Sequence, residues 1–282
     1  MHLPFVEVLG NSWTYDTITT RSTASFYTVG DTWAESTPVV TQTTALLKVL
    51  GGDANIDNFL LATRANKLDL KGEVLNDRIT SIKEKFMDTF YYGDDSADTK
   101  SFDGLHLLMS STTYNTVQEA TDGNGGAGSS AALQQAIDLI HGFDASHLLM
   151  AKTTRRLMNT YLDGVGSAFT AVRDEYGRII EYFRGLKIAV DDHITITEST
   201  TDAGIYESST DDDQTSIFVA TFAPKAFCGI QGPNSVETVP LGDLETKDAQ
   251  GYRIKWYCGL KFEDLRSCAK YIGILSGSAW EA

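Results

Sequence analysis

Residues 69–92 read DLKGEVLNDRITSIKEKFMDTFYY and contain the clearest helical pattern of the chain. Apolar side chains recur in it every three or four residues, at Leu75, Ile79, Ile82, Phe86 and Phe90. That spacing is typical of an amphipathic helix with one buried face. The helix is expected to begin near Asp69 and to end before Gly93, which makes it long for a globular protein.

Before this helix lies a segment that is rich in threonine. Residues 14–44 contain eleven threonines and three serines among 31 residues. Threonine and aromatic residues favour extended structure, but the segment has too few apolar residues to form a core. The sequence predicts a two-stranded arm with its turn at Gly30-Asp31 or just before Pro38. Because a lone two-stranded ribbon is only marginally stable in water, the arm is expected to lie on another surface.

After the long helix, the pattern alternates between helices and strands. We expect helices at 133–140 and 154–162, and buried strands at 147–150 and 216–222. Residues 252–262 alternate apolar and polar side chains strictly, which predicts a long, half-buried antiparallel strand. This order of elements indicates an α+β fold that contains an α/β unit.

The composition excludes several classes of protein. A chain of 282 residues with 42% hydrophobic and 22% charged side chains is not collagen-like, of low complexity or a disulfide scaffold. No segment resembles a membrane helix or a secretory signal. The three cysteines lack metal-site spacing and are expected to be small buried hydrophobes in a reducing compartment. The net charge of -15 argues against nucleic acid as a direct ligand, because phosphate contacts need surplus lysine and arginine.

No motif points to catalysis or to a cofactor. Residues 123–128 match GxGxxG, but the preceding strand and the later acidic residue of a dinucleotide site are missing, so a flexible loop is predicted. Residues 191–213 hold eight carboxylates and no lysine or arginine, which predicts a solvated, protruding stretch. Its run Asp211-Asp212-Asp213 lacks the spacing of a calcium loop. The sequence therefore predicts no catalytic residue, no metal and no cofactor.

The order of the segments resembles the Hong Kong 97-type major capsid proteins of tailed bacteriophages. The resemblance covers nearly the whole chain and rests on the arm, the long helix, Phe102-Asp103-Gly104-Leu105, the helix-strand-helix unit at 131–162 and the terminal strands. Shorter strings at 145–157, 185–194 and 217–230 fit the same pattern. It implies an α+β capsid fold with a long spine helix, an extended β-arm, a peripheral domain and an α/β axial domain.

This resemblance divides the chain into five parts. They are an N-terminal arm at 1–13, an extended loop at 14–50, a peripheral domain at 51–127 with the spine helix at about 69–92, an axial domain at 128–227, and return strands of the peripheral domain at 228–282. Some family members carry a cleaved scaffolding segment before the loop, whereas residues 1–13 alone precede it here. That difference implies a separate scaffolding protein or a processed chain. The Lys-Asn crosslink of some members is not predicted, because no matching set of residues is found.

The function that the resemblance implies is structural. It implies a major capsid protein that self-assembles in the host cytoplasm into hexamers and pentamers of an icosahedral phage head. In the virion this head encloses double-stranded DNA without sequence-specific binding. Separate scaffolding, portal and decoration proteins are further partners that it allows, and no membrane is involved.

Three alternatives stay open. The first is an encapsulin-type nanocompartment shell protein with the same fold. The second is a soluble α+β enzyme with an unrecognised carboxylate site, for which an arm folded back on its own body is expected. A phage tail or adhesin-like binding module is the third, and the long helix speaks against it.

Five residues of the arm are candidates for the interface between subunits: Tyr15, Arg21, Phe26, Tyr27 and Trp33. Large aromatic residues and arginine are the usual anchors of protein interfaces, and exposed ones need a partner surface. For each of them, packing within the arm itself is an equally open interpretation.

Overall fold

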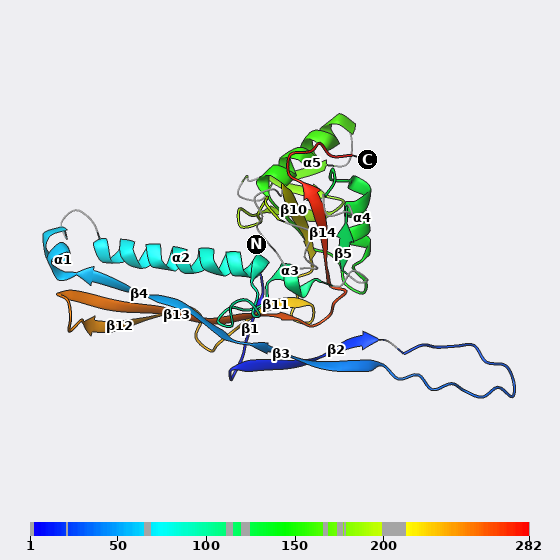
Figure 1. The fold of residues 1–282 in the computed structure, drawn as a ribbon, viewed down its shortest axis with the longest axis horizontal. Helices are drawn as coiled ribbons and strands as arrows, with labels where there is room; N and C mark the ends of the chain where they lie inside the picture. The colour runs from blue at the N-terminus through cyan, green and yellow to red at the C-terminus, as the bar shows by residue number, and fades with distance from the viewer. Residues whose placement is uncertain are drawn as a thin grey trace.

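The computed structural model describes residues 3–20, 22–64, 69–110, 115–119, 125–165, 169–173, 177, 179–198 and 213–281. Figure 1 shows three parts, namely a long helix lying along an elongated sheet, a compact unit over one end of that helix, and a ribbon that projects away from both. Helices and strands are mixed along the chain, which confirms the predicted α+β class.

The long helix is α2 (Leu70–Tyr92), as the apolar spacing predicts. The Asp69 carboxylate caps its start by accepting a hydrogen bond from the Gly72 amide at 3.1 Å. The helix ends at Gly93, whose amide donates to the Thr89 carbonyl at 2.8 Å. Its buried face consists of Ile82, Phe86, Phe90 and Tyr91.

Beneath α2 lies a five-stranded sheet in the order β1-β11-β13-β12, with β4 also paired to β13. Its central strand, β13 (Ala249–Phe262), pairs antiparallel with β4 (Lys48–Asp57) from Ala249 opposite Asp57 to Cys258 opposite Lys48. The other strands are β11 (Phe227–Gln231), which lies between β13 and β1 (Phe5–Glu7), and β12 (Glu237–Asp243), which pairs antiparallel with β13. The short helix α1 (Asn58–Arg64) follows β4.

The predicted alternation of β13 is confirmed for its first half and wrong for its end. Residues 258–262 are all buried, including Lys261. Cys258, Leu260 and Phe262 pack into the core beneath α2. Lys261, on the opposite face, lies over the ring of Trp13. The strand is therefore covered on both faces here.

The compact unit is built on a seven-stranded sheet in the order β5-β14-β10-β6-β9-β8-β7. Helices α4 (Ser130–Asp138) and α5 (Lys152–Val165) confirm the predicted helix-strand-helix unit around β6. Its strands are β5 (Thr116–Gln118), β6 (His147–Met150), β7 (Phe169–Arg173), β8 (Ile179–Phe183), β9 (Leu186–Val190), β10 (Gln214–Ala220) and β14 (Cys268–Leu275). The strands β5 and β14, which the predicted division assigns to peripheral parts, pair in this sheet.

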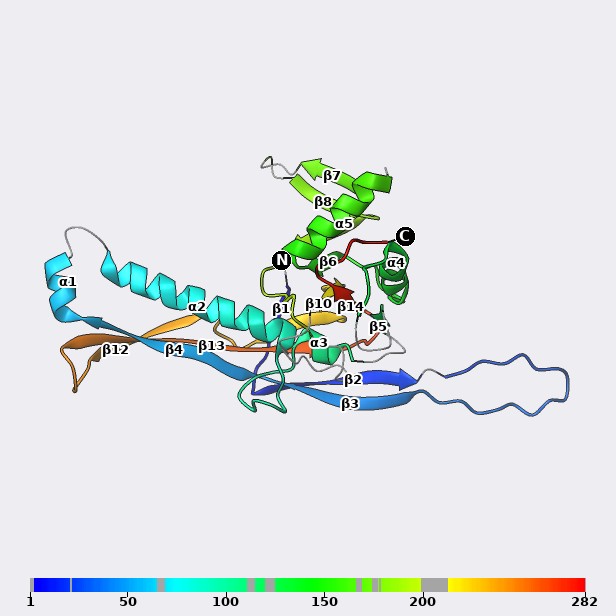
Figure 2. The ribbon, with the colours of Figure 1, turned by 45° about the horizontal axis from the view of Figure 1, so that its top comes forward.

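The ribbon is formed by β2 (Ser12–Thr20) and β3 (Val39–Leu46), paired antiparallel from Ser12 opposite Leu46 to Thr20 opposite Val39. Both views show it projecting beyond the sheet, at the end opposite α1 (Figures 1 and 2). The far turn lies at Gly30, which has φ +97° and so occupies a conformation that favours glycine. This is the first of the two turn positions that the sequence left open.

The acidic stretch is described at residues 191–198 and 213. Asp192 is exposed and pairs with the exposed Lys152 at 2.5 Å. This residue is solvated, as predicted for the stretch. Asp191, however, accepts a hydrogen bond from the Tyr91 hydroxyl at 3.1 Å, and Glu198 is buried. The predicted solvated stretch is wrong for these two residues, because this part of the segment packs against the end of α2.

The glycine-rich loop has a structural role where it is described. The Gly126 amide donates to the Gly273 carbonyl at 2.8 Å, and the Leu275 amide donates to the Gly126 carbonyl at 2.8 Å. A Cβ at Gly128 would lie 2.6 Å from the Trp280 ring, so glycine is needed there. The start of the GxGxxG match, at 123 and 124, lies outside the described residues.

All three cysteines are buried and unpaired, as the sequence predicts. Burial raises the pKa of both Cys258 and Cys268 to about 12. Such thiols stay protonated and pack as small apolar side chains.

Candidate interaction surface

The ribbon of β2 and β3 has almost no core of its own. Along β3, Ala45 alone is buried, and Val39, Val40 and Leu46 are exposed. Its long polar run is threonine-rich, and the Thr14 and Thr44 hydroxyls lie 3.3 Å apart across the pair. Cross-strand contacts of this kind stabilise a ribbon weakly. Away from the root, where Ala45 packs on the body, the strand β3 is exposed from Val39 to Thr44 and is available for contact with another molecule.

The tip of the arm, residues 22–38, is nevertheless folded locally. The rings of Tyr27 and Trp33 stack with their centroids 4.4 Å apart. The Asp31 carboxylate accepts hydrogen bonds from the amide of Thr28 at 2.7 Å and from its hydroxyl at 2.8 Å. These contacts hold the turn in one shape before any partner binds.

The same tip exposes its largest apolar side chains. Phe26 and Val29 are fully exposed, at 107% and 108%, and Trp33 is 78% exposed. Burying such a side chain contributes about 1.5–3 kcal/mol. A fixed turn that carries uncovered apolar groups is typical of a surface awaiting a partner.

The root of the arm is fixed to the body by Lys261. Its ammonium group lies 5.1 Å from the centroid of the Trp13 ring and 5.4 Å from that of Tyr15. The same group pairs with Glu263 at 2.5 Å and donates to the Pro224 carbonyl at 3.2 Å. Burial raises the pKa of the Tyr15 hydroxyl. These contacts fix the direction in which the arm leaves the sheet.

The predicted interface residues thus fall into different settings. Phe26 and Trp33 lie exposed at the tip, and Tyr27 is half-buried in the stack with Trp33. Tyr15 lies at the root and packs on the chain's own body. Arg21 lies outside the described residues. Two further residues of the arm surface are not predicted from the sequence, namely Val29 at the tip and Lys261 at the root. The strict alternation of residues 252–262 places Lys261 on the polar face.

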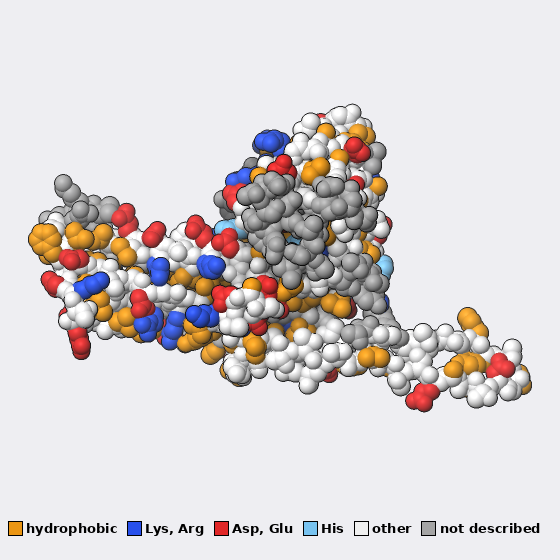
Figure 3. All heavy atoms as spheres, viewed as in Figure 1, with side chains coloured by type: hydrophobic (Ala, Val, Ile, Leu, Met, Phe, Trp, Pro, Cys, Tyr) orange, Lys and Arg blue, Asp and Glu red, His pale blue; other side chains and the backbone are white. Residues whose placement is uncertain are grey.

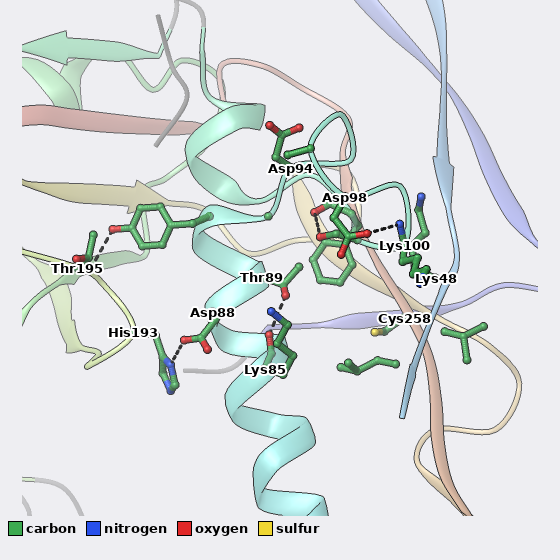
Figure 4. Close-up of a pocket in the computed structure, with 17 residues that line it drawn as sticks. Lys48, Lys85, Asp88, Thr89, Asp94, Asp98, Lys100, His193, Thr195 and Cys258 are labelled. Carbon is green, nitrogen blue, oxygen red and sulfur yellow. Dashed lines mark hydrogen bonds and ion pairs between the residues drawn. The ribbon is translucent and has the colours of Figure 1, made fainter. Parts of the chain in front are cut away.

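A pocket of about 600 Å³ lies where the last turns of α2 meet β4 and the turn after the helix (Figure 4). The ring nitrogen Nδ1 of His193 lies 2.6 Å from the Asp88 carboxylate at its edge. Lys48 pairs with Asp95 at 2.6 Å and donates to the Thr99 carbonyl at 2.8 Å. Segments far apart in the sequence therefore build this pocket.

Next to the pocket, a buried network joins the end of α2 to the compact unit. Glu198 accepts hydrogen bonds from the hydroxyls of Tyr92 and Ser216. Its burial raises its pKa to about 7, against the opposing effect of the two hydroxyls and Lys270. Lys270 donates to the His106 carbonyl at 2.8 Å, and burial lowers its pKa to about 8. The carboxyl group therefore titrates near neutral pH inside the molecule.

Replacing Glu198 with glutamine is expected to change how stability depends on pH. The pKa of Glu198 is about 7 in the folded chain and near 4.5 in the unfolded chain. Between these two pH values the folded state therefore binds more protons at this group than the unfolded state does. Lowering the pH from 7.5 to 5 thus stabilises the fold through this group. Glu198→Gln should remove about 1–3 kcal/mol of that gain.

Urea unfolding of both proteins at pH 5 and pH 7.5 measures this difference. Glu84→Gln, at an exposed position on α2, is the control and should follow the unmodified chain. The same pH dependence in Glu198→Gln and in the unmodified chain would show that Glu198 does not titrate in this range.

Within the described residues, no cluster of three or more histidine, cysteine or acidic side chains is placed to hold a metal. None of the described helices is long and apolar enough to cross a membrane.

Comparison with solved structures finds close matches of fold at low sequence identity. The holo-SrpI encapsulin complex from Synechococcus elongatus PCC 7942 gives a TM-score of 0.74 at 13% identity, covering 99% of this chain and 88% of that chain. The capsid of the native GTA particle gives 0.64 at 13% identity, over 96% and 88% of the two chains. The capsid of cyanophage P-SCSP1u gives 0.56 at 11% identity, over 95% and 84%. No family model and no curated protein matches the sequence.

Proposed function

We propose that this chain, which has the Hong Kong 97-type fold seen in phage capsids and in an encapsulin, is the structural subunit of a closed icosahedral shell. The observation that carries this proposal is the projecting arm with its uncovered tip (Figures 1 and 2). A monomer leaves Phe26 and Val29 in water. A closed symmetric shell gives every copy a neighbour that can cover them.

Within this class we favour the head of a tailed bacteriophage, built from hexamers and pentamers and enclosing double-stranded DNA. The net charge of -15 supports this choice, because an acidic wall would not adhere tightly to packaged DNA. Strong, salt-sensitive binding of the purified subunit to duplex DNA would count against it. Scaffolding, portal and decoration proteins are further partners in this proposal.

An encapsulin-type shell is the second candidate. The observation in its favour is the TM-score of 0.74 to SrpI, which exceeds the values of 0.64 and 0.56 for the two capsids. An enzyme is a weaker candidate, because the arm does not fold back on its own body (Figure 1).

The contents of the particles separate the two shells. Particles purified from the producing cells and treated with nuclease are expected to retain double-stranded DNA. Gel electrophoresis and mass spectrometry of the contents make this measurement. Particles that hold a defined protein and no protected DNA would support the encapsulin instead, and the absence of particles would contradict both.

A further inference from the structure

Residues 191–198, which we call the clasp, connect the compact unit to the end of α2. The Asp191 carboxylate accepts a hydrogen bond from the Tyr91 hydroxyl at 3.1 Å. The ring nitrogen Nδ1 of His193 lies 2.6 Å from the Asp88 carboxylate, and Figure 4 shows these two side chains directed at each other. Asp88 and Tyr91 are neighbours on the helix surface because they are three residues apart. The clasp therefore holds one face of the last turns of the helix.

The backbone of the clasp is fixed within the compact unit. The Glu198 amide donates to the Gln214 carbonyl at 2.9 Å. The Thr215 hydroxyl donates to the Thr195 carbonyl, also at 2.9 Å. Between these contacts, the side chain of Ile194 is buried. The clasp is thus part of the compact unit, and its side chains reach out to the helix.

Glu198 is the buried end of the clasp. It is 3% exposed, and its carboxylate accepts hydrogen bonds from the hydroxyls of Tyr92 in α2 and Ser216 in β10. The cation that faces it is Lys270 of β14, whose ammonium group donates to the His106 carbonyl at 2.8 Å. The rings of His106 and Tyr92 lie with their centroids 5.9 Å apart. Lys270 and the two hydroxyls favour the ionised carboxylate, but burial outweighs them.

His193 is the exposed end of the clasp, and Figure 3 shows a histidine beside acidic side chains at the surface where the compact unit meets the long helix. Its ring forms an ion pair with Asp88 only when it is protonated. Its amide donates to the Asp191 carboxylate at 3.1 Å. The other charged groups that line the pocket with it are Lys48, Lys85, Asp94, Asp98 and Lys100. Together with Asp88 these are three lysines and three carboxylates, so their formal charges balance and the contact with Asp88 decides the effect of protonation.

Both ends of the clasp therefore respond to pH in the same direction. A proton on His193 adds an ion pair to the contact with Asp88. A proton on Glu198 removes the cost of burying an ionised carboxylate. Loss of either proton weakens the attachment of the compact unit to α2.

We propose that the clasp is a pH-sensitive contact, which holds the compact unit on the end of α2 more tightly in mildly acidic solution than above neutral pH. Opening of the clasp leaves the two parts joined through the core, where the rings of Tyr91 and Phe218 lie 5.6 Å apart. This inference concerns the single subunit and does not rest on the proposed shell function.

Amide hydrogen exchange of the full chain, measured by mass spectrometry, tests the clasp. When the clasp opens, water reaches Glu198 and its pKa returns from about 7 to near 4.5. After correction for the intrinsic exchange rate, the protection of residues 191–198 is expected to fall at least about tenfold between pH 5.5 and pH 7.5. Equal protection at the two pH values would overturn the proposal.

Low concentrations of urea distinguish opening of the clasp from unfolding of the whole chain. A local opening exposes little surface, so exchange of residues 191–198 should hardly depend on urea, whereas exchange of the central strand β13 should accelerate. The same dependence on urea in both segments would show that the clasp opens only when the chain unfolds, and would also overturn the proposal.

A double variant tests whether these two residues carry the effect. Glu198→Gln/His193→Asn removes both titrating groups and should reduce the change in protection to less than about twofold. Glu245→Gln/His141→Asn makes the same changes at two exposed positions outside the clasp and should retain the full change. A full change in the first variant would overturn the assignment to Glu198 and His193. Because the exchange of the unmodified chain is measured first, it decides the proposal even where a variant does not fold.

Discussion

Replacing both Phe26 and Trp33 with serine is expected to lower the yield of assembled particles roughly a hundredfold or more while the subunit stays folded. Both side chains are exposed in the free chain, so their loss removes no core contact of the subunit. In an assembled shell, each buried side chain of this kind contributes about 1.5–3 kcal/mol per copy. Loss of both side chains weakens every contact between copies by the sum of these two contributions. We therefore expect few shells to close.

Trp33 also stacks on Tyr27, so its replacement could change the shape of the tip as well as remove an exposed apolar side chain. A second variant separates these two effects. Phe26→Ser/Val29→Ser leaves the stack intact and should lower assembly as well. Circular dichroism and thermal unfolding check that both variants are folded, and negative-stain microscopy counts the particles. Normal shells from both variants would show that the tip is not an interface.

Replacing Phe90 with alanine is expected to destabilise the subunit by about 3–5 kcal/mol. Phe90 is fully buried, and its ring lies 5.0 Å from that of Tyr91 and 5.8 Å from that of Phe227. It joins α2 to the strand β11, so the cavity left behind would lie at the centre of the core. Urea unfolding measures the change.

The matched control for Phe90→Ala lies on the same helix. Ile79 is 41% exposed, and Ile79→Ala should cost less than about 1 kcal/mol. If both variants lost the same free energy of unfolding, the core would not lie where α2 meets the sheet and the compact unit.

The elements with strong local periodicity were predictable. The helix at 70–92 and the unit α4-β6-α5 follow from apolar spacing alone. Ile79 was expected in the buried face but is exposed, because the compact unit lies over the C-terminal end of α2 and leaves that part of the helix uncovered (Figure 1). Periodicity predicts which face of a helix is apolar, and the packing partner decides how much of that face is buried.

The candidate site was predictable only in part. A threonine-rich segment without a core indicated the arm, and its aromatic residues marked the tip. The pairing of Tyr27 with Trp33 and the burial of Lys261 depend on tertiary contacts that no local pattern contains. The same holds for the pocket, because β4, α2 and the segment at 193–195 come together only in the fold.

Light scattering combined with negative-stain electron microscopy shows whether this chain assembles into a shell. The chain is purified across a range of salt and protein concentrations, alone and co-produced with the proteins encoded beside it. Closed shells, or hexamers and pentamers, are the predicted result. A monomer under every one of these conditions would show that the chain is not a shell subunit.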